Sequence, residues 1–167
     1  RGLPSYGPDG RVRPELAESW TQDGPNVWVF KLKQAKFQNG KPVTSEDVRW
    51  SIEQIVAKKS TAYFKGDFST IDRVETPDPM TVRFVMKSPN VVLPEWLANP
   101  HAPIIAKDSI TSNPPGIGAG PFRLVAYQRD ALIRYEANKE HWSFRANRPA
   151  DNPAAGRRTR SARSRCC

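Results

Sequence analysis

The sequence contains almost no cysteine. Its two cysteines, Cys166 and Cys167, are the last two of its 167 residues. Adjacent cysteines rarely bridge each other, because the disulfide geometry strains the peptide between them. With no other cysteine, the chain has neither a disulfide framework nor the ligand spacing of a zinc site. We therefore expect no metal and no cofactor, while cysteine usage leaves the cellular compartment open.

Residue sets that carry catalysis are also missing. The only histidines, His101 and His141, have no serine, cysteine or metal-spaced partner in an evident motif. The adjacent carboxylates Glu46 and Asp47 are explained by the first turn of a helix, where negative charge is favourable. We therefore do not expect the chain to be an enzyme.

A glycine-rich stretch with Gly116, Gly118 and Gly120 suggests a dinucleotide-binding loop. The Rossmann fingerprint would need a small residue at position 121 and a helix after it. Pro121 stands there, and a strand is predicted beyond it. We interpret these glycines instead as positions where two backbones approach closely.

Long apolar runs are absent as well. No stretch approaches the roughly 20 residues that a membrane-spanning helix needs. The chain opens on RGLP, without the basic and apolar regions of an export signal. We expect it to begin inside a longer protein.

What the chain does contain favours a mixed fold. Hydrophobic residues make up 38% of it, and 16 prolines and 10 glycines are spread along its length. This distribution is typical of many short strands and turns rather than of a helix bundle. The fold class we predict is α+β.

The net charge of +9 would suggest nucleic acid as a partner. Residues 151–167, however, hold five arginines against one acid, Asp151. This tail lacks hydrophobic periodicity and is predicted to be disordered. Nonspecific binding of nucleic acid through the tail is the alternative function that remains open. A base-stacking platform is not expected, because the five tryptophans are scattered rather than arrayed on one strand, and no specific nucleic acid is expected as a partner.

Hydrophobic alternation and capping signals predict the main elements. Residues 26–33 alternate as a strand, and residues 70–76 and 81–87 form a hairpin around a turn at 77–79. Thr44 and Asp47 predict the start of a helix of roughly 14 residues, whose apolar stripe contains Val48 and Ile52. Other predictions are a helical turn at 14–20, a short helix at 91–98, a short strand at 104–105 and a hairpin of 122–128 with 132–137.

The order of these segments resembles a known family. Residues 14–20 read PELAESW, residues 30–33 read FKLK, and residues 36–48 read KFQNGKPVTSEDV. This series is similar to the extracytoplasmic solute-binding proteins of ABC transporters, family 5, the peptide, nickel and opine type. The likeness runs over residues 2–150, with two departures: Ala119 replaces a usual threonine in GAGPF, and His141 replaces a usual tyrosine.

The resemblance implies part of a type II periplasmic binding protein fold, in which two lobes close on a ligand. It implies that residues 1–112 form the extra subdomain of the N-terminal lobe and that residues 113–150 return into the ligand-binding lobe. The expected partners are a peptide or small-molecule ligand in the full-length parent and ABC permease subunits in the membrane. The expected state is a monomer, and the expected location of the parent is periplasmic or extracytoplasmic.

The resemblance also suggests ligand contacts. Tyr63 and Phe64 follow the capped helix, where family members often present an aromatic side chain to the pocket. His101 and Pro103 precede the predicted strand at 104–105, near the cleft. Packing roles compete with recognition at each position, and Tyr63 is the preferred candidate.

The likeness stops near residue 151. A family member would continue into another strand, whereas this chain changes to arginine-rich and proline-rich sequence. We expect a truncated or frameshifted product that lacks the opposing lobe and binds ligand weakly or not at all by itself.

Overall fold

The computed structural model describes residues 1–57, 60, 62, 65–107, 109–111, 116–128 and 130–142. The arginine-rich tail of residues 151–167 therefore lies outside the described residues. The elements are β1 (Pro4–Tyr6), β2 (Val12–Pro14), β3 (Ala17–Gln22), β4 (Val27–Leu32), α1 (Ser45–Val56), α2 (Lys65–Phe68), β5 (Ile71–Asp78), β6 (Thr81–Met86), α3 (Leu93–Ala98), a 3-10 turn (Ser109–Thr111), β7 (Phe122–Gln128) and β8 (Leu132–Ala137). No helix among them is both long enough and apolar enough to cross a membrane.

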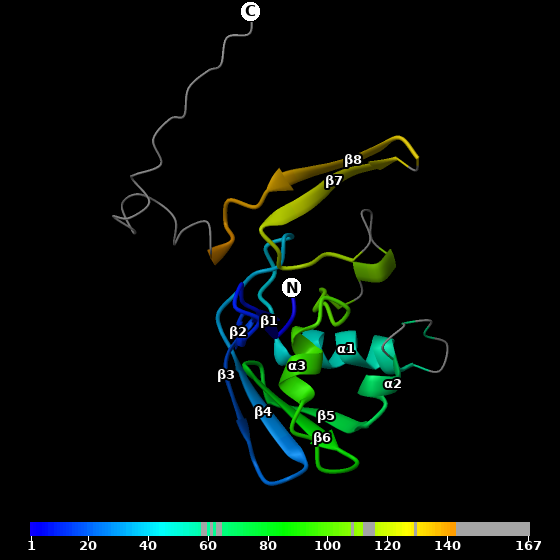
Figure 1. Ribbon diagram of the computed structural model, residues 1–167. Helices are drawn as coiled ribbons and strands as arrows, with labels where there is room; N and C mark the ends of the chain where they lie inside the picture. The colour runs from blue at the N-terminus through cyan, green and yellow to red at the C-terminus, as the bar shows by residue number, and fades with distance from the viewer. Residues whose placement is uncertain are drawn as a thin grey trace, which may run out of the picture.

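A four-stranded antiparallel sheet organises the body of the molecule. Its strand order is β3-β4-β6-β5, and β1 pairs with β2 and β7 with β8 in two separate hairpins. Helix α1 lies against one face of this sheet, while the β7–β8 hairpin extends away from the body (Figure 1). The mixture of helix and strand is the predicted α+β class.

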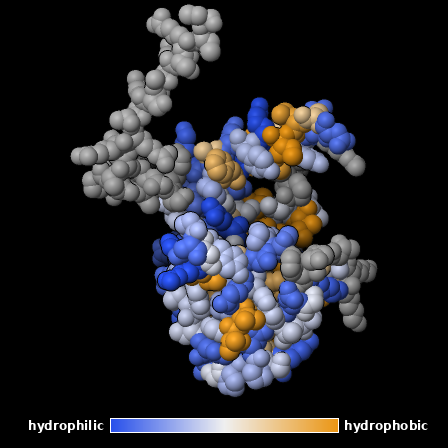
Figure 2. Space-filling view, in the orientation of Figure 1, coloured by the Kyte–Doolittle hydropathy of each residue, from blue (hydrophilic) through white to orange (hydrophobic). Residues whose placement is uncertain are grey.

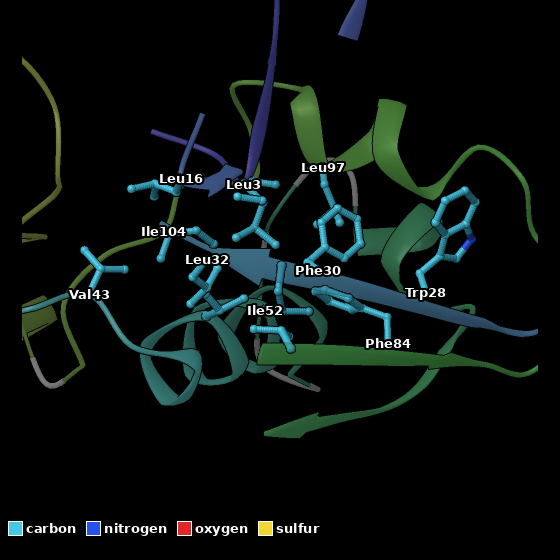
Figure 3. Packing of buried hydrophobic residues seen from close by; sticks show 14 of the residues in the cluster. Leu3, Leu16, Trp28, Phe30, Leu32, Val43, Ile52, Phe84, Leu97 and Ile104 are labelled. Atoms are coloured by element: carbon cyan, nitrogen blue, oxygen red, sulfur yellow. The ribbon is translucent and has the colours of Figure 1, made fainter. Parts of the chain in front are cut away.

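The core fills the space between the sheet and the helices. On β4 the alternation predicted from the sequence buries Trp28, Phe30 and Leu32. Phe30 lies opposite Val82 in the register of β4 with β6, and its ring meets the edge of Phe84 at a centroid distance of 5.4 Å. Figure 3 shows these rings within the cluster of buried side chains. Non-directional burial of this kind is the main source of stability for the sheet.

Helix α1 follows its predicted pattern. It begins after Thr44 and spans 12 residues, close to the length predicted. Val48 and Ile52 are fully buried against the sheet, and Ile55 and Val56 are partly buried beside them. The hydroxyl of Ser45 also donates to the Asp78 carbonyl at 2.7 Å, which joins the start of the helix to the end of β5.

The prediction of a helical turn at residues 14–20 is wrong. Residues 17–22 form β3 instead, and Trp20 lies opposite Phe30 of β4. A single helical turn fixes several backbone angles for very few hydrogen bonds. Pairing with the edge of β4 satisfies more backbone groups and also buries Leu16 and Ala17, so tertiary contacts override the local signal.

The turn of the central hairpin lies further along the chain than predicted. Strand β5 continues through Pro77 to Asp78, so the turn is confined to Pro79 and Met80. Proline is tolerated there because β5 is an edge strand and its register shifts between Glu75 and Asp78. The hairpin itself is confirmed, as is the hairpin of β7 with β8.

Candidate ligand-binding groove

A groove runs between the second half of α1 and the segment at residues 103–105. It is open to solvent, with a volume of about 440 Å³. The lining residues are Ser51, Gln54, Ile55, Ser60, Ala62, Pro103 and Ile105. Four of these seven side chains are apolar, and Gln54 adds an amide group from the helix.

The side chain of Ser51 connects the two walls of this groove, α1 and the segment at residues 103–105, through hydrogen bonds. Its side chain is buried at 3% exposure, with the Oγ atom 2.7 Å from the Asp47 carbonyl. The same oxygen accepts the N–H of Ile105 at 3.1 Å and lies 3.2 Å from the Ile105 carbonyl. One hydroxyl therefore holds the segment at 103–105 at a fixed distance from α1. The predicted strand at 104–105 is reduced to a single bridge between Ile105 and Gly118.

Asp47 makes a second hydrogen-bonded connection between α1 and the segment that follows residue 105, one turn earlier in the helix. Its Oδ2 atom accepts the N–H of Thr44 at 3.0 Å and the hydroxyl of Thr44 at 2.7 Å. Its Oδ1 atom accepts the N–H of Lys107 at 2.9 Å. The sequence predicted the contact with Thr44 from the spacing of a capping box. It gave no signal for Lys107, which is 60 positions away.

The predicted ligand contacts differ in whether they line the groove. Pro103 lines the groove. His101 lies in the exposed turn after α3, where its backbone N–H donates to Asn99, and it is not among the lining residues. Tyr63 and Phe64 lie outside the described residues, although Ser60 and Ala62, just before them, line the groove.

The glycine-rich segment at residues 116–120 joins the body to the β7–β8 hairpin. The interpretation that its glycines mark close approaches of two backbones is confirmed only in part. Gly118 bonds to Gln38 through the backbone at 2.9 Å, so two backbones do meet there. A side chain at Gly118 would nevertheless meet no atom within 4 Å, so packing does not require glycine. Gly116 has a φ of 72°, which does favour glycine. The Rossmann reading is excluded by the strand that follows.

Gln38 is a contact that sequence reasoning missed. Its Nε2 atom donates to the carbonyl of Phe122 at 2.6 Å and to that of Gly120 at 3.3 Å. Asn138, after β8, donates from its backbone to the Pro121 carbonyl at 2.7 Å. The Gln38 bonds hold the start of the hairpin against the turn that contains Gln38, and the Asn138 bond joins the end of the hairpin to its start. Glutamine in a hairpin turn carries no sequence signal for such a role.

His141 is buried in the packed structure. It is 3% exposed and packs against Trp142, with ring centroids 3.7 Å apart and the rings tilted by 33°, and the Nζ atom of Lys33 lies 4.3 Å from the Trp142 ring centre. Burial lowers the pKa of the His141 imidazole, with the nearby Arg1 charge contributing. Burial also lowers the pKa of the Lys33 ammonium. The neutral imidazole is therefore the form that the packed structure favours.

Replacing Ser51 with alanine should loosen the groove. The substitution leaves the N–H of Ile105 without its acceptor, so we expect a loss of about 1–2 kcal/mol in the free energy of unfolding. Hydrogen exchange at the Ile105 amide should accelerate more than exchange in β4. Ser69→Ala is the control, because the Ser69 hydroxyl donates locally to the Gly66 carbonyl on an exposed turn. Equal effects of the two substitutions would refute the role of Ser51.

The structure thus presents an antiparallel sheet covered by helices, an open groove beside α1 and a projecting hairpin. In the part of the chain that the structure describes, no group of three or more metal-binding side chains occurs.

The chain belongs to the bacterial extracellular solute-binding proteins, family 5, whose middle-region model matches residues 11–156. It is 32% identical to an ABC transporter peptide-binding protein of Brucella ovis, over 74% of this chain and 25% of that protein. It is 30% identical to the di/tripeptide-binding protein 2 of Pseudomonas aeruginosa, over 78% of this chain and 30% of that protein.

Solved structures show the same relationship. The periplasmic binding protein AgaA of A. tumefaciens R10, in complex with agropinic acid, superposes with a TM-score of 0.79 at 36% identity. The match covers 85% of this chain and 30% of AgaA. The predicted fold, part of a type II periplasmic binding protein, is confirmed. Proteins of this family are non-enzymatic components of transport, which confirms the expectation that the chain is not an enzyme.

The chain spans about a quarter to a third of the length of these relatives. The relatives are substrate-binding proteins, and the one from Pseudomonas aeruginosa is named for di- and tripeptides. What this chain itself binds does not follow from their names.

Proposed function

We propose that this chain forms part of the substrate-binding component of an ABC importer for peptides or related small solutes. Membership of family 5 carries the proposal, and the groove between α1 and residues 103–105 supports it. In the parent protein, the partners are the ligand and the permease subunits, and the location is periplasmic or extracytoplasmic. Nickel chelates and opines are other solutes of the same size class.

The proposed division of the chain has two parts. Residues 1–112 form the extra subdomain, and residues 113–150 form the return segment into the ligand-binding lobe. The projection of the β7–β8 hairpin from the body supports this division (Figure 1). Across this division Gln38 donates hydrogen bonds to the carbonyls of Gly120 and Phe122, and Ala119 packs into the core cluster of the first part.

The groove within this chain supplies only one wall of a ligand site. Its lining comes from α1 and the segments beside it, all within the first 105 residues. Tight binding of a small ligand needs most of its surface buried and polar groups placed from several directions. In proteins that close by hinge motion, the second lobe provides the other half of these contacts. We therefore propose that the chain alone binds its ligand weakly.

Calorimetry with di- and tripeptides tests this proposal. We expect the purified chain to show no heat of binding at ligand concentrations up to about 1 mM, which corresponds to less than roughly 4 kcal/mol of affinity. The di/tripeptide-binding protein 2 of Pseudomonas aeruginosa, titrated with the same peptides, is the positive control. Saturable heats with a micromolar midpoint from the chain alone would contradict the proposal that one wall is insufficient.

A further inference from the structure

The turn between Lys36 and Pro42 contains Asn39, the only asparagine in the sequence that is followed by a glycine. The other asparagines precede valine, proline, lysine or arginine. Asn39, Gly40 and Lys41 are exposed, and Figure 2 shows mainly hydrophilic side chains over the body beside the β7–β8 hairpin. Water therefore has access to an asparagine whose next residue carries no side chain.

This pair of residues has an intramolecular reaction open to it. The backbone nitrogen of Gly40 can attack the Cγ atom of Asn39, because residue 40 has no Cβ atom to obstruct the approach. The new N–Cγ bond closes a succinimide ring, and the side-chain nitrogen of Asn39 leaves as ammonia with the proton that Gly40 gives up. Water then opens the ring at one of its two carbonyl carbons, which leaves aspartate or isoaspartate at position 39. Nothing is oxidised or reduced, and water is the only co-reactant.

The closed turn engages both reacting groups in hydrogen bonds. The N–H of Gly40 donates to the Phe37 carbonyl at 2.9 Å, and the Asn39 Oδ1 atom accepts the N–H of Lys41 at 3.1 Å. The N–H of Phe37 donates to the Lys41 carbonyl at 2.8 Å, and Gly40 has a φ of 83°. This is a three-residue hairpin loop with glycine in the left-handed position. Since attack requires the Gly40 nitrogen to leave Phe37, the turn must open before Asn39 reacts.

Gln38, the residue before Asn39, connects this turn to the start of the β7–β8 hairpin. Its backbone N–H donates to the Gly118 carbonyl at 2.9 Å. Its Nε2 atom donates to the carbonyls of Phe122 at 2.6 Å and Gly120 at 3.3 Å. Opening of the turn breaks or distorts these bonds. A slow reaction that needs local opening proceeds in proportion to the population of the open form, so the Gln38 bonds oppose it.

We propose that Asn39 is a site of spontaneous deamidation and isoaspartate formation, and that the side chain of Gln38 limits the rate by keeping the turn closed. The coupling acts in both directions. In isoaspartate the main chain passes through the side-chain carbon, which adds one atom to the backbone between Gln38 and Gly40. This added atom moves Gln38 relative to Gly40 and weakens its bonds to the start of β7. The inference stands apart from the proposed function, because no residue of the groove takes part.

Incubation of the purified chain in mildly alkaline buffer, followed by peptide mapping with mass spectrometry, tests the proposal. Electron-transfer fragmentation distinguishes isoaspartate from aspartate at position 39. We expect Asn39 to be modified ahead of every other asparagine in the same sample. Gln38→Ala removes two hydrogen bonds and should raise the rate at Asn39 about fivefold or more. In the isoaspartate form, hydrogen exchange at the Gln38 amide should be faster than in the unmodified chain.

Ser51→Ala distinguishes opening of the turn from unfolding of the whole chain. It removes hydrogen bonds to Ile105 and Asp47 but none within the turn, so it should leave the rate at Asn39 unchanged. Circular dichroism checks that Gln38→Ala retains the fold. Independently of any variant, the native chain unfolded in urea should be modified faster than the folded chain. Modification of other asparagines ahead of Asn39, equal rates for Gln38→Ala and the native chain, equal acceleration by Ser51→Ala and Gln38→Ala, or equal rates with and without urea would each overturn the proposal.

Discussion

Replacing Phe30 with alanine is expected to lower the free energy of unfolding by about 3–5 kcal/mol. The ring is completely buried at the centre of the sheet, between Trp20 at a centroid distance of 6.0 Å and Phe84 at 5.4 Å. Its removal leaves a cavity that neither neighbour can fill without leaving its own contacts. Since small domains are stable by only about 5–15 kcal/mol, the variant should be close to unfolding.

Urea denaturation followed by tryptophan fluorescence measures this loss, because Trp20 and Trp28 both lie on strands of this sheet. Phe122→Ala is the matched control: it removes the same atoms from a side chain that is 62% exposed. That control should change the free energy of unfolding by less than about 1 kcal/mol. A similar urea midpoint for both variants would show that the packing of the sheet does not depend on Phe30.

Replacing Asp47 with alanine should lower the free energy of unfolding by about 2–3 kcal/mol, which is more than the loss of an ordinary helix cap. The carboxylate accepts hydrogen bonds from Thr44 and from the amide of Lys107, so one substitution releases both the start of α1 and the segment at 105–107. Hydrogen exchange at the Lys107 amide should accelerate together with exchange in the first turn of α1.

Two further variants identify the cause. Asp47→Asn retains one acceptor oxygen, so its free energy of unfolding should fall between those of the Asp47→Ala variant and the native protein. Asp23→Ala removes an exposed carboxylate that forms an ion pair with Arg83 at 3.4 Å, and it should change the free energy of unfolding by less than about 1 kcal/mol. If Asp47→Ala left the Lys107 amide protected, the connection between helix and groove would not depend on this carboxylate.

Local signals predicted those elements whose evidence lies within a few residues. Alternation along 26–33 is enough to define β4, because a strand needs only a two-residue period to bury one face. Thr44 and Asp47 define the start of α1, because a helix start is a contact between residues three apart. The order of such segments carried the family resemblance, which the match to residues 11–156 confirms.

Errors arose where pairing with another strand completed the structure. Residues 14–20 read locally as a helical turn, yet β3 forms because β4, the next strand along the chain, offers it an edge. Pro77 read as a turn residue, yet it remains in β5 because that strand needs no hydrogen bond from its outer side. In both cases the strand pairing lies beyond the few residues that a local signal covers.

The groove shows the same division between features that local sequence signals predict and features that depend on tertiary contacts. Pro103 was selected from its position in the chain and does line the groove, while the assignments of Tyr63 and Phe64 remain predictions. Ser51 and Asp47, which hold the groove walls together, were read only as parts of a helix. Their second partners, Ile105 and Lys107, are brought to them by the path of the chain through β5, β6 and α3.

The sequence by itself determined the α+β class, the strands with strong alternation, the capped helix and the family. These depend on periodicity and on ordered motifs, which are properties of neighbouring residues. Only the tertiary structure decided which strands share an edge, and that one carboxylate serves both a helix cap and the groove wall. Such outcomes depend on contacts between segments up to 60 residues apart, and the free energy of those contacts exists only after the chain has folded.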